Sequence, residues 1–67
     1  MSETITYDVP AIHCGHCAAS IKEEVGEVAG VESVEVEVDS KVVTIQGEQL
    51  SDEALRAAIQ EAGYEAA

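Results

Sequence analysis

The apolar residues of this 67-residue chain change their spacing from segment to segment, and this pattern limits its folds more than any other feature. Over residues 4–9 every second residue is apolar, which is typical of a β-strand with one buried face. The alternation returns over 34–38. The turn Asp39-Ser40-Lys41 then leads into a further apolar run at 42–45, and the pair of runs predicts a β-hairpin.

Two other segments space their apolar residues three or four apart, as an amphipathic α-helix does. The first begins at Gly15 or His16 and is expected to end near Gly30. The second begins at Ser51, a favourable N-cap, and is expected to end at Gly63. The buried stripes of the two helices would be Ala18, Ile21, Val25 and Val28 in the first, and Leu55, Ala58, Ile59 and Ala62 in the second.

The order of these elements predicts an α+β, ferredoxin-like βαββαβ fold. In this fold an antiparallel sheet carries two helices on one face. The final strand would be a short edge strand formed from Tyr64 onward. Glutamates alternate with the strand valines, which agrees with a sheet whose other face meets water. No linker or internal repeat divides the sequence, so we expect residues 1–67 to form a single domain.

The chain is strongly acidic, with 14 acidic and 3 basic residues and a formal charge of −11 at pH 7. Such a charge argues against nucleic acid and anionic membranes as partners. No apolar run approaches the ~20 residues of a membrane span, and the first residues lack signal-peptide features, so we expect a cytoplasmic protein without membrane insertion. The acidic surface could keep the protein soluble, adapt it to high salt or steer it toward a basic partner.

Both cysteines and both histidines lie within the pentapeptide His13-Cys14-Gly15-His16-Cys17. Residues 9–21 contain no charged side chain, so the motif occupies a neutral patch. The predicted elements place Cys14 in the loop after the first strand and Cys17 in the first helical turn, where both sulfurs can converge on one ion. The helix N-terminus favours thiolate over thiol. Gly15 is expected to let the loop turn.

The number of ligands limits the metals that suit this pair. Two thiolates are too few for a closed structural Zn(II) site, which takes four ligands. They suffice for a soft ion such as Cu(I), and the open site leaves room for a partner's thiolate, which suits transfer. His13 and His16 could each add a ligand or merely face solvent. The charge of Lys22 is expected close enough to stabilise a negative copper bis-thiolate.

The chain resembles the heavy-metal-associated domains, and among them the free-standing bacterial copper chaperones. The resemblance rests on the order of strands and helices, on Cys14-Gly15-His16-Cys17 at the first helix, on Gly30-Val31 and on Ala62-Gly63-Tyr64. The chain departs from the usual family sequence in two places. Ala11-Ile12 stands where Gly-Met is usual, and His13 stands where a small polar residue is more common. Ile12 is expected to fill the apolar space of the methionine.

This resemblance implies a Cu(I) metallochaperone that is not an enzyme. Cys14 and Cys17 would bind the copper and pass it by ligand exchange to the metal-binding domain of a copper-transporting P-type ATPase. Tyr64 would lie beside the metal and shield the sulfurs, although it could equally cover the edge of the core. We expect the apo protein to be a monomer, and a shared metal could bridge a dimer.

Two competing functions stay open. A module of this kind could carry Hg(II), Zn(II) or Cd(II) in a resistance or efflux system. A small dithiol oxidoreductase would also use a CxxC pair, but a thioredoxin-type context needs a larger sheet and a bulky or proline-containing dipeptide between the cysteines. The sequence suggests neither a Ser/His/Asp set nor a carboxylate pair in a cleft, so no catalytic residue is predicted.

Overall fold

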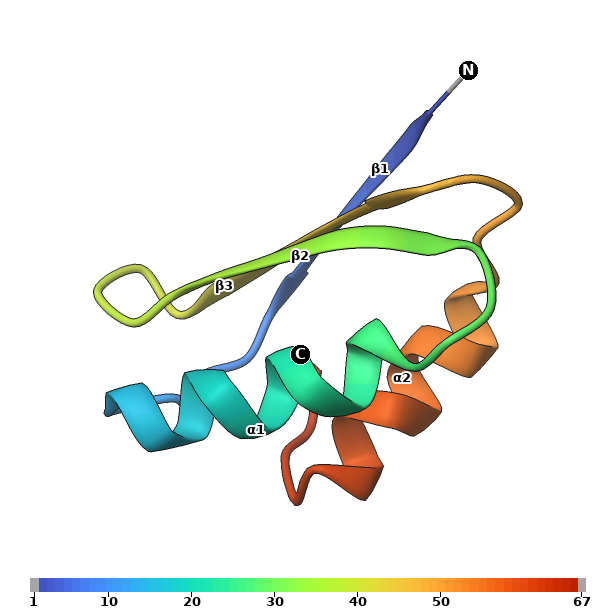
Figure 1. Ribbon diagram of the computed structural model, residues 1–67. Coiled ribbons are helices and arrows are strands. Elements are labelled where there is room, and N and C mark those ends of the chain that lie inside the picture. The colour runs from blue at the N-terminus through green and yellow to red at the C-terminus, as the bar shows by residue number, and fades with distance from the viewer. Residues whose placement is uncertain (1, 67) are drawn as a thin grey trace.

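Three antiparallel strands form a sheet, and two helices pack against one of its faces (Figure 1). The computed structural model describes residues 2–66. In chain order the elements are β1 (Glu3–Asp8), α1 (Gly15–Gly26), β2 (Val31–Glu37), β3 (Val42–Gly47) and α2 (Asp52–Glu61). The strand order is β1-β3-β2, so β3 lies in the centre. This is the predicted ferredoxin-like arrangement.

The register of the sheet directs one apolar face toward the helices. Ile45 of β3 lies opposite Ile5 on one side and Val34 on the other. Two residues before Ile45 on the same face of β3, Val43 lies opposite Tyr7 and Val36. The rows between them carry polar side chains such as Thr6, Thr44 and Glu35, which form the face away from the helices.

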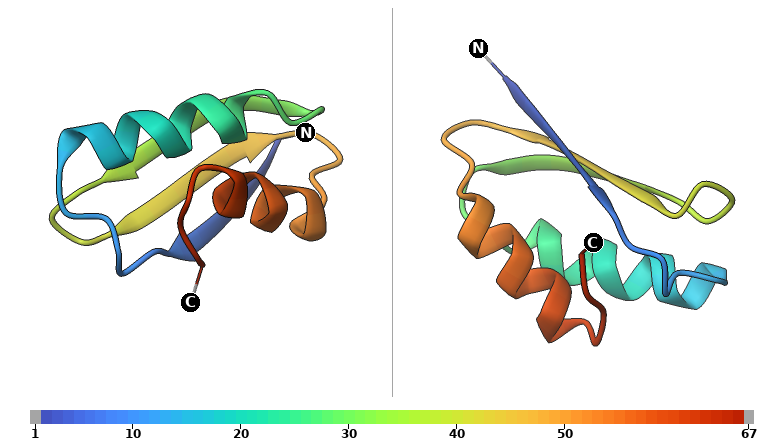
Figure 2. Two further views of the ribbon diagram at one scale, coloured as in Figure 1. Left: turned by 90° about the horizontal axis from the view of Figure 1, so that it is seen from below. Right: turned by 180° about the vertical axis from the view of Figure 1, so that it is seen from behind.

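The core lies between this face and the two helices. The two further views show both helices on the same side of the sheet (Figure 2). Its largest fully buried side chains come from both strands and helices: Ile12, Ile21, Ile45, Leu55, Ile59, Val9, Val25 and Val43. Among residues 2–66, no helix is long and apolar enough to cross a membrane. The expectation that Ile12 fills apolar space is confirmed, because its side chain has no exposed area.

Helix α1 ends earlier than its apolar spacing suggests. We expected it to reach Gly30, but it ends at Gly26. Beyond that point the amides of Glu27 and Val28 bond to carbonyls only three residues back, at 3.2 and 3.1 Å, so the chain tightens into a turn. Glycine is a poor helix former, which explains the stop at this position. Val28 still packs against the core, but from the turn.

The short edge strand expected from Tyr64 onward is absent from residues 64–66. Gly63 has a φ of +93°, and the Tyr64 amide bonds back to the Ile59 carbonyl at 3.1 Å, so the chain reverses after α2. Glu65 and Ala66 belong to residue types that are depleted in strands. This segment passes near β1 without pairing to it (Figure 2), and Ala66 packs against the core.

Candidate metal centre

The two cysteines lie at the N-terminal end of α1. Cys14 is the N-cap residue, with extended backbone angles, and Cys17 is the third residue of the helix. Their Sγ atoms are 3.5 Å apart, and both are free thiols. The sequence therefore placed both residues correctly. Their sulfurs converge as the spacing predicted.

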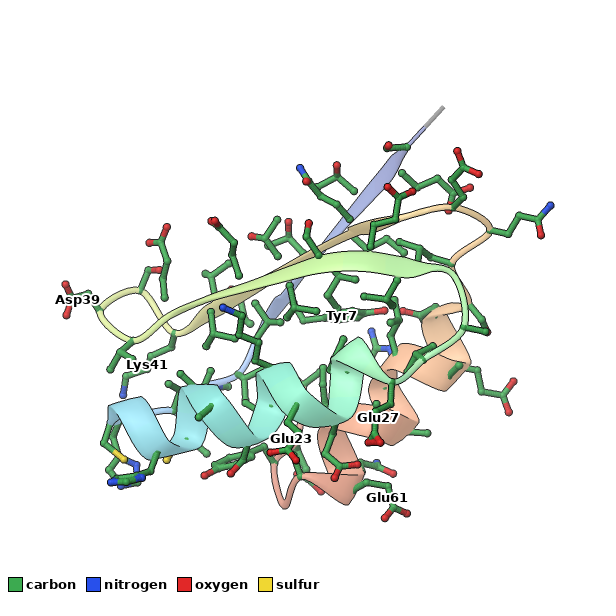
Figure 3. The ribbon with its side chains drawn as sticks, in the orientation of Figure 1. Tyr7, Glu23, Glu27, Asp39, Lys41 and Glu61 are labelled. Atoms are coloured by element: carbon green, nitrogen blue, oxygen red, sulfur yellow. The ribbon has the colours of Figure 1, made fainter. Side chains whose placement is uncertain are left out.

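The segment before the helix, residues 9–14, is here called the cysteine loop. The Val9 amide donates to the Lys41 carbonyl at 2.8 Å, and the Ile12 amide donates to the Val9 carbonyl at 3.1 Å. The Lys41 ammonium also donates to the Pro10 carbonyl at 3.3 Å, and Figure 3 shows this side chain reaching from the β2–β3 hairpin toward the start of α1. The hairpin thus holds the loop through one backbone bond and one side-chain bond.

The two thiols differ in exposure, and together they are more covered than the sequence suggested. Cys14 is half-buried, whereas Cys17 is only 6% exposed and belongs to the core cluster. We expected an open site. The difference arises because Cys17 lies one helical turn before Ile21 and so shares its buried face. Cys14 is the sulfur that an incoming group meets first.

Cys17 is the more acidic thiol. Its pKa is lowered from the ordinary 9.0 to about 7, first because the Tyr64 hydroxyl hydrogen-bonds to its sulfur. The backbone of His13, the Cys14 side chain and the positive charge of His13 lower it further, and burial opposes them. A substantial fraction of Cys17 is therefore thiolate near neutral pH, and thiolate is the form that binds metals.

Tyr64 lies beside this site. The pKa of its hydroxyl is raised, first because it donates to Cys17, then because of burial and the nearby negative charge of both cysteines. Its side chain is half-buried and also packs against the core. The two roles considered for this tyrosine, shielding the sulfurs and covering the core edge, are thus compatible.

The histidines differ in their relation to the sulfurs. A ring nitrogen of His13 and the two sulfurs all lie within 4.8 Å of one another, so these three residues form a group able to hold a metal ion. The His13 Nδ1 atom lies 2.9 Å from the Ala11 carbonyl oxygen. His16 is exposed on the first turn of α1 and is not part of this group.

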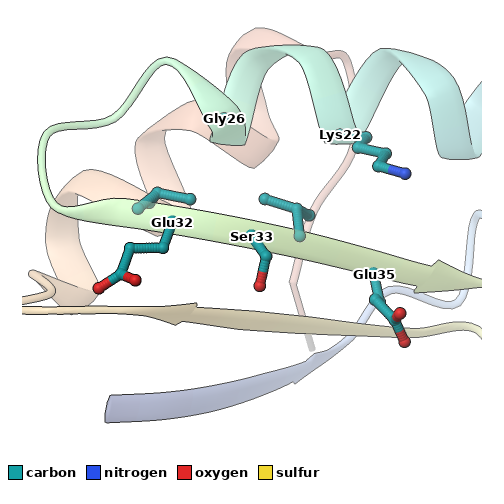
Figure 4. Close-up of a pocket in the computed structure, with 7 residues that line it drawn as sticks. Lys22, Gly26, Glu32, Ser33 and Glu35 are labelled. Atoms are coloured by element: carbon teal, nitrogen blue, oxygen red, sulfur yellow. The ribbon is translucent and has the colours of Figure 1, made fainter. Parts of the chain in front are cut away.

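Lys22 and Gly15 do not take the roles expected from the sequence. Lys22 lines an open hollow of about 470 Å³ between α1 and β2, together with Gly26, Glu32 and Glu35, and neither cysteine lines it (Figure 4). Lys41 is instead the cation that contacts the cysteine loop, and no local signal in the sequence reveals this. Gly15 is the first residue of α1, and a Cβ added there would meet nothing within 4 Å, so the loop does not require glycine at this position.

The comparisons with known proteins all point to one family. The model of the heavy-metal-associated domain matches residues 6–65. The chain is 34% identical over 61 residues to the COP-associated protein of Helicobacter pylori, covering 90% of this chain and 92% of that one. It is 34% identical over 65 residues to the mercuric transport protein periplasmic component of Pseudomonas aeruginosa, and the match covers 94% of this chain and 71% of that protein. It is also 35% identical to heavy metal-associated isoprenylated plant protein 31 of Arabidopsis thaliana, but it spans only 45% of that protein's length.

Solved structures agree with the fold. Apo-CopP from Helicobacter pylori superposes with a TM-score of 0.87 at 32% identity, covering 97% of this chain and all of that one. Oxidized MerP from Ralstonia metallidurans gives a TM-score of 0.90 at 26% identity, covering 100% and 96%. A copper binding domain from HMA7, a P-type ATPase, gives 0.88 at 23% identity, covering 100% and 92%, and shows the fold alone.

The fold and the paired thiols define a small domain with a candidate metal site at one end of a helix. The chain belongs to the heavy-metal-associated domain family. Its relatives include a COP-associated protein and a mercuric transport protein, so the family likeness does not single out one metal.

Proposed function

We propose that the protein is a Cu(I) metallochaperone that binds copper through Cys14 and Cys17. The observation that carries this function is the 3.5 Å separation of two free sulfurs at a helix N-terminus. Thiolate is a preferred ligand of Cu(I), which accepts two ligands. The pKa of about 7 for Cys17 supplies one thiolate near neutral pH, and binding of the metal would deprotonate the other.

The unequal burial of the two sulfurs suggests the order of transfer. A partner's thiolate would reach the ion beside the half-buried Cys14 and form an intermediate with three sulfurs. Cys14 would then leave, and Cys17, at 6% exposure, would leave last. No electron changes hands in this exchange, since copper stays Cu(I) and each sulfur stays a thiolate.

The partner we propose is the metal-binding domain of a copper-transporting P-type ATPase. A domain of such an ATPase shares this fold, which would let the two proteins present similar sites to each other. The formal charge of −11 would draw this chain toward a basic surface, while residues 9–21 carry no charge that would oppose close contact of the two sites. The protein would act in the cytoplasm as a monomer when free of metal, and shared copper could bridge two copies.

The relatives also favour a second candidate, a carrier of Hg(II), because one of them is named as a mercuric transport protein. Zn(II) and Cd(II) remain alternatives within the same class. A small dithiol oxidoreductase is the less favoured alternative from another class. Catalytic reduction of an insulin-like disulfide, undiminished by copper chelators, would establish it in place of the chaperone.

The test of the proposed function is competition for Cu(I) under strict reduction. The reduced protein should remove one Cu(I) per chain from a chromophoric cuprous chelator, and it should hold Cu(I) more tightly than Zn(II). A Cys14→Ser, Cys17→Ser double variant serves as the control and should remove none. Preference for Zn(II) over Cu(I) would overturn the copper assignment.

A further inference from the structure

We propose that the hollow between α1 and the outer edge of β2 binds an extended, basic peptide segment of another protein, which adds to β2 as a further strand. The hollow has a volume of about 470 Å³ and is lined by Lys22 and Gly26 of α1 and by residues 31–35 of β2. It is called the β2 groove below. Neither cysteine lines it, so this inference is independent of the proposed copper function.

β2 offers a free backbone edge to such a peptide. The strand order β1-β3-β2 places β2 at the border of the sheet, and within residues 2–66 only β3 pairs with it. An edge strand exposes amides and carbonyls to which an extended peptide can bind by strand addition. A bulge between Val31 and Ser33 interrupts the ladder with β3, so the regular part of this edge is residues 33–37. A short added strand would pair there.

The groove is hollow because Gly26 has no side chain (Figure 4). Glycine is unfavourable in a helix, yet nothing in the backbone requires it at this position. Its φ is not in the left-handed region, and a Cβ built there would meet nothing within 4 Å. The strand side of the groove is apolar, since Val34 is buried and Val31 is half-buried. The space therefore suits one apolar side chain of a bound strand.

The charged groups of the groove lie on two sides of it. In Figure 4 the side chains of Glu32 and Glu35 point away from α1, whereas Lys22 extends from the helix itself. All three side chains are exposed, and within residues 2–66 none of them forms an ion pair. Each is therefore available to a charge of opposite sign on a bound peptide.

The spacing of these groups matches an added strand. Lys22 and Gly26 lie one helical turn apart, about 6 Å along the axis, and alternate residues of a strand lie about 6.6 Å apart. A strand on β2 would place an apolar side chain at Gly26 and the next side chain of the same face at Lys22, where an acidic residue fits. Basic residues on its other face would meet Glu32 or Glu35. The expected segment thus alternates basic residues with an apolar and an acidic one.

A second copy of this chain is a poorer occupant of the groove. Two β2 strands paired edge to edge would bring Glu35 and Glu37 of one copy near the same residues of the other, and like charges opposite each other destabilise a sheet. The formal charge of −11 on each copy adds to this repulsion. The same charge attracts a basic segment.

The probe is the end-blocked peptide Thr-Lys-Val-Lys-Glu-Lys-Thr, titrated into the isotope-labelled reduced protein and followed by NMR. The amide signals of residues 33–37 and of Lys22 to Gly26 should shift and saturate in the micromolar range. One control peptide exchanges lysine and glutamate throughout and so reverses every charge. The other keeps the charges but carries N-methyl groups on its backbone amides, so it cannot donate to β2. We expect neither control to bind.

Three protein variants separate the groove from general charge attraction. Gly26→Leu fills the groove and Glu35→Lys reverses one of its charges, and each should weaken peptide binding by at least about tenfold. Glu61→Lys makes the same change of net charge at an exposed residue of α2 (Figure 3) and should bind within about twofold of wild type. Gly26→Leu should melt no lower than wild type, because leucine is the better helix former.

Several results would overturn the inference. Equal binding of the N-methylated peptide, or equal losses in Glu35→Lys and Glu61→Lys, would reduce the effect to general charge attraction. Unchanged affinity in Gly26→Leu would show that the groove is not occupied. A wild-type dimer in sedimentation that Gly26→Leu abolishes would replace the peptide by a second copy. The Cys14→Ser, Cys17→Ser double variant should bind the peptide as wild type does, so failure of the copper function would leave this test intact.

Discussion

The Tyr64 hydroxyl hydrogen-bonds to the Cys17 sulfur and so connects the turn after α2 to the first turn of α1. This contact is the largest single cause of the low pKa of Cys17. It links the shape of the C-terminal turn to the chemistry of the thiol. The end of the chain thus takes part in the candidate site although the cysteine motif lies near its beginning.

Replacing Tyr64 by phenylalanine should therefore raise the pKa of Cys17 from about 7 toward 9.0. The measurement is the ultraviolet absorbance of the thiolate as a function of pH in the reduced apo protein. Tyr7→Phe is the control and should leave this titration in place. Coinciding curves for Tyr64→Phe and wild type would show that the hydroxyl does not tune Cys17.

The same shift fixes the sign of a pH effect on stability. The folded-state pKa of Cys17, about 7, lies below its ordinary value of 9.0. Its thiolate therefore contributes stability that is fully present above pH 9.0 and is lost as the pH falls through 7. Denaturant unfolding of the reduced apo protein should show this rise between pH 7 and 9, and Cys17→Ala should lack it.

The two cysteine variants should differ in stability although both lose tight Cu(I) binding. Cys14→Ser replaces a half-buried side chain and should leave the melting temperature nearly unchanged. Cys17→Ser places a hydroxyl in the core beside Ile21 and should lower the melting temperature by several degrees. Thermal unfolding by circular dichroism measures the difference. Equal losses for both variants would contradict the burial described for Cys17.

Tyr7 anchors α2 to the sheet. Its hydroxyl donates to Asp52 at 2.5 Å, Arg56 lies over its ring at 5.3 Å, and Arg56 Nε pairs with Asp52 at 3.0 Å. Tyr7→Phe removes this hydrogen bond and should lower the free energy of unfolding by about 1 kcal/mol. Arg56→Lys is a useful second variant, because it weakens the pair on Asp52 but keeps the tyrosine bond.

Tyr7 also predicts a loss of stability at alkaline pH. Burial, followed by the bond to Asp52, raises its pKa from 10.0 to about 12. The neutral hydroxyl therefore contributes stability that is fully present below pH 10.0 and is lost as the pH rises through 12. The difference in unfolding free energy between wild type and Tyr7→Phe should shrink over this interval. A constant difference would contradict the assignment.

Gly47 should tolerate no side chain. A Cβ built there would lie 2.0 Å from the Gly30 carbonyl oxygen, at the point where the Glu48 amide donates to that same oxygen at 2.9 Å. Gly47→Ala should therefore cost about 2 kcal/mol or more through forced movement of the backbone. Gly15→Ala is the matched control, because a Cβ there meets nothing within 4 Å. Similar stability for the two variants in urea would contradict this packing.

The sequence predicts those features that depend on local order. Alternation of apolar residues located β1 and β2, and the apolar run after the turn located β3. Ser51 caps α2 through a 3.3 Å bond from the Ala54 amide, as its position suggested. The convergence of Cys14 and Cys17 follows from their spacing at a helix start. Each of these signals is contained within a few neighbouring residues.

The features that the sequence did not predict either join distant parts of the chain or depend on competing local effects. The bond from Tyr7 to Asp52 and the contact of Lys41 with Pro10 arise only once the sheet and helices have packed. The burial of Cys17 depends on how α1 lies against the core. The early end of α1 depends on Gly26, which outweighs the apolar spacing that Val28 continues.

The proposed function requires that the two sulfurs together hold Cu(I). The direct measurement is the Cu(I) affinity of the fully reduced protein, obtained by competition with a cuprous chelator of moderate strength. We expect the wild type to withdraw one Cu(I) per chain from the chelator, and neither Cys14→Ser nor Cys17→Ser to withdraw any. Failure of the wild type to withdraw copper, or undiminished affinity in either serine variant, would contradict it.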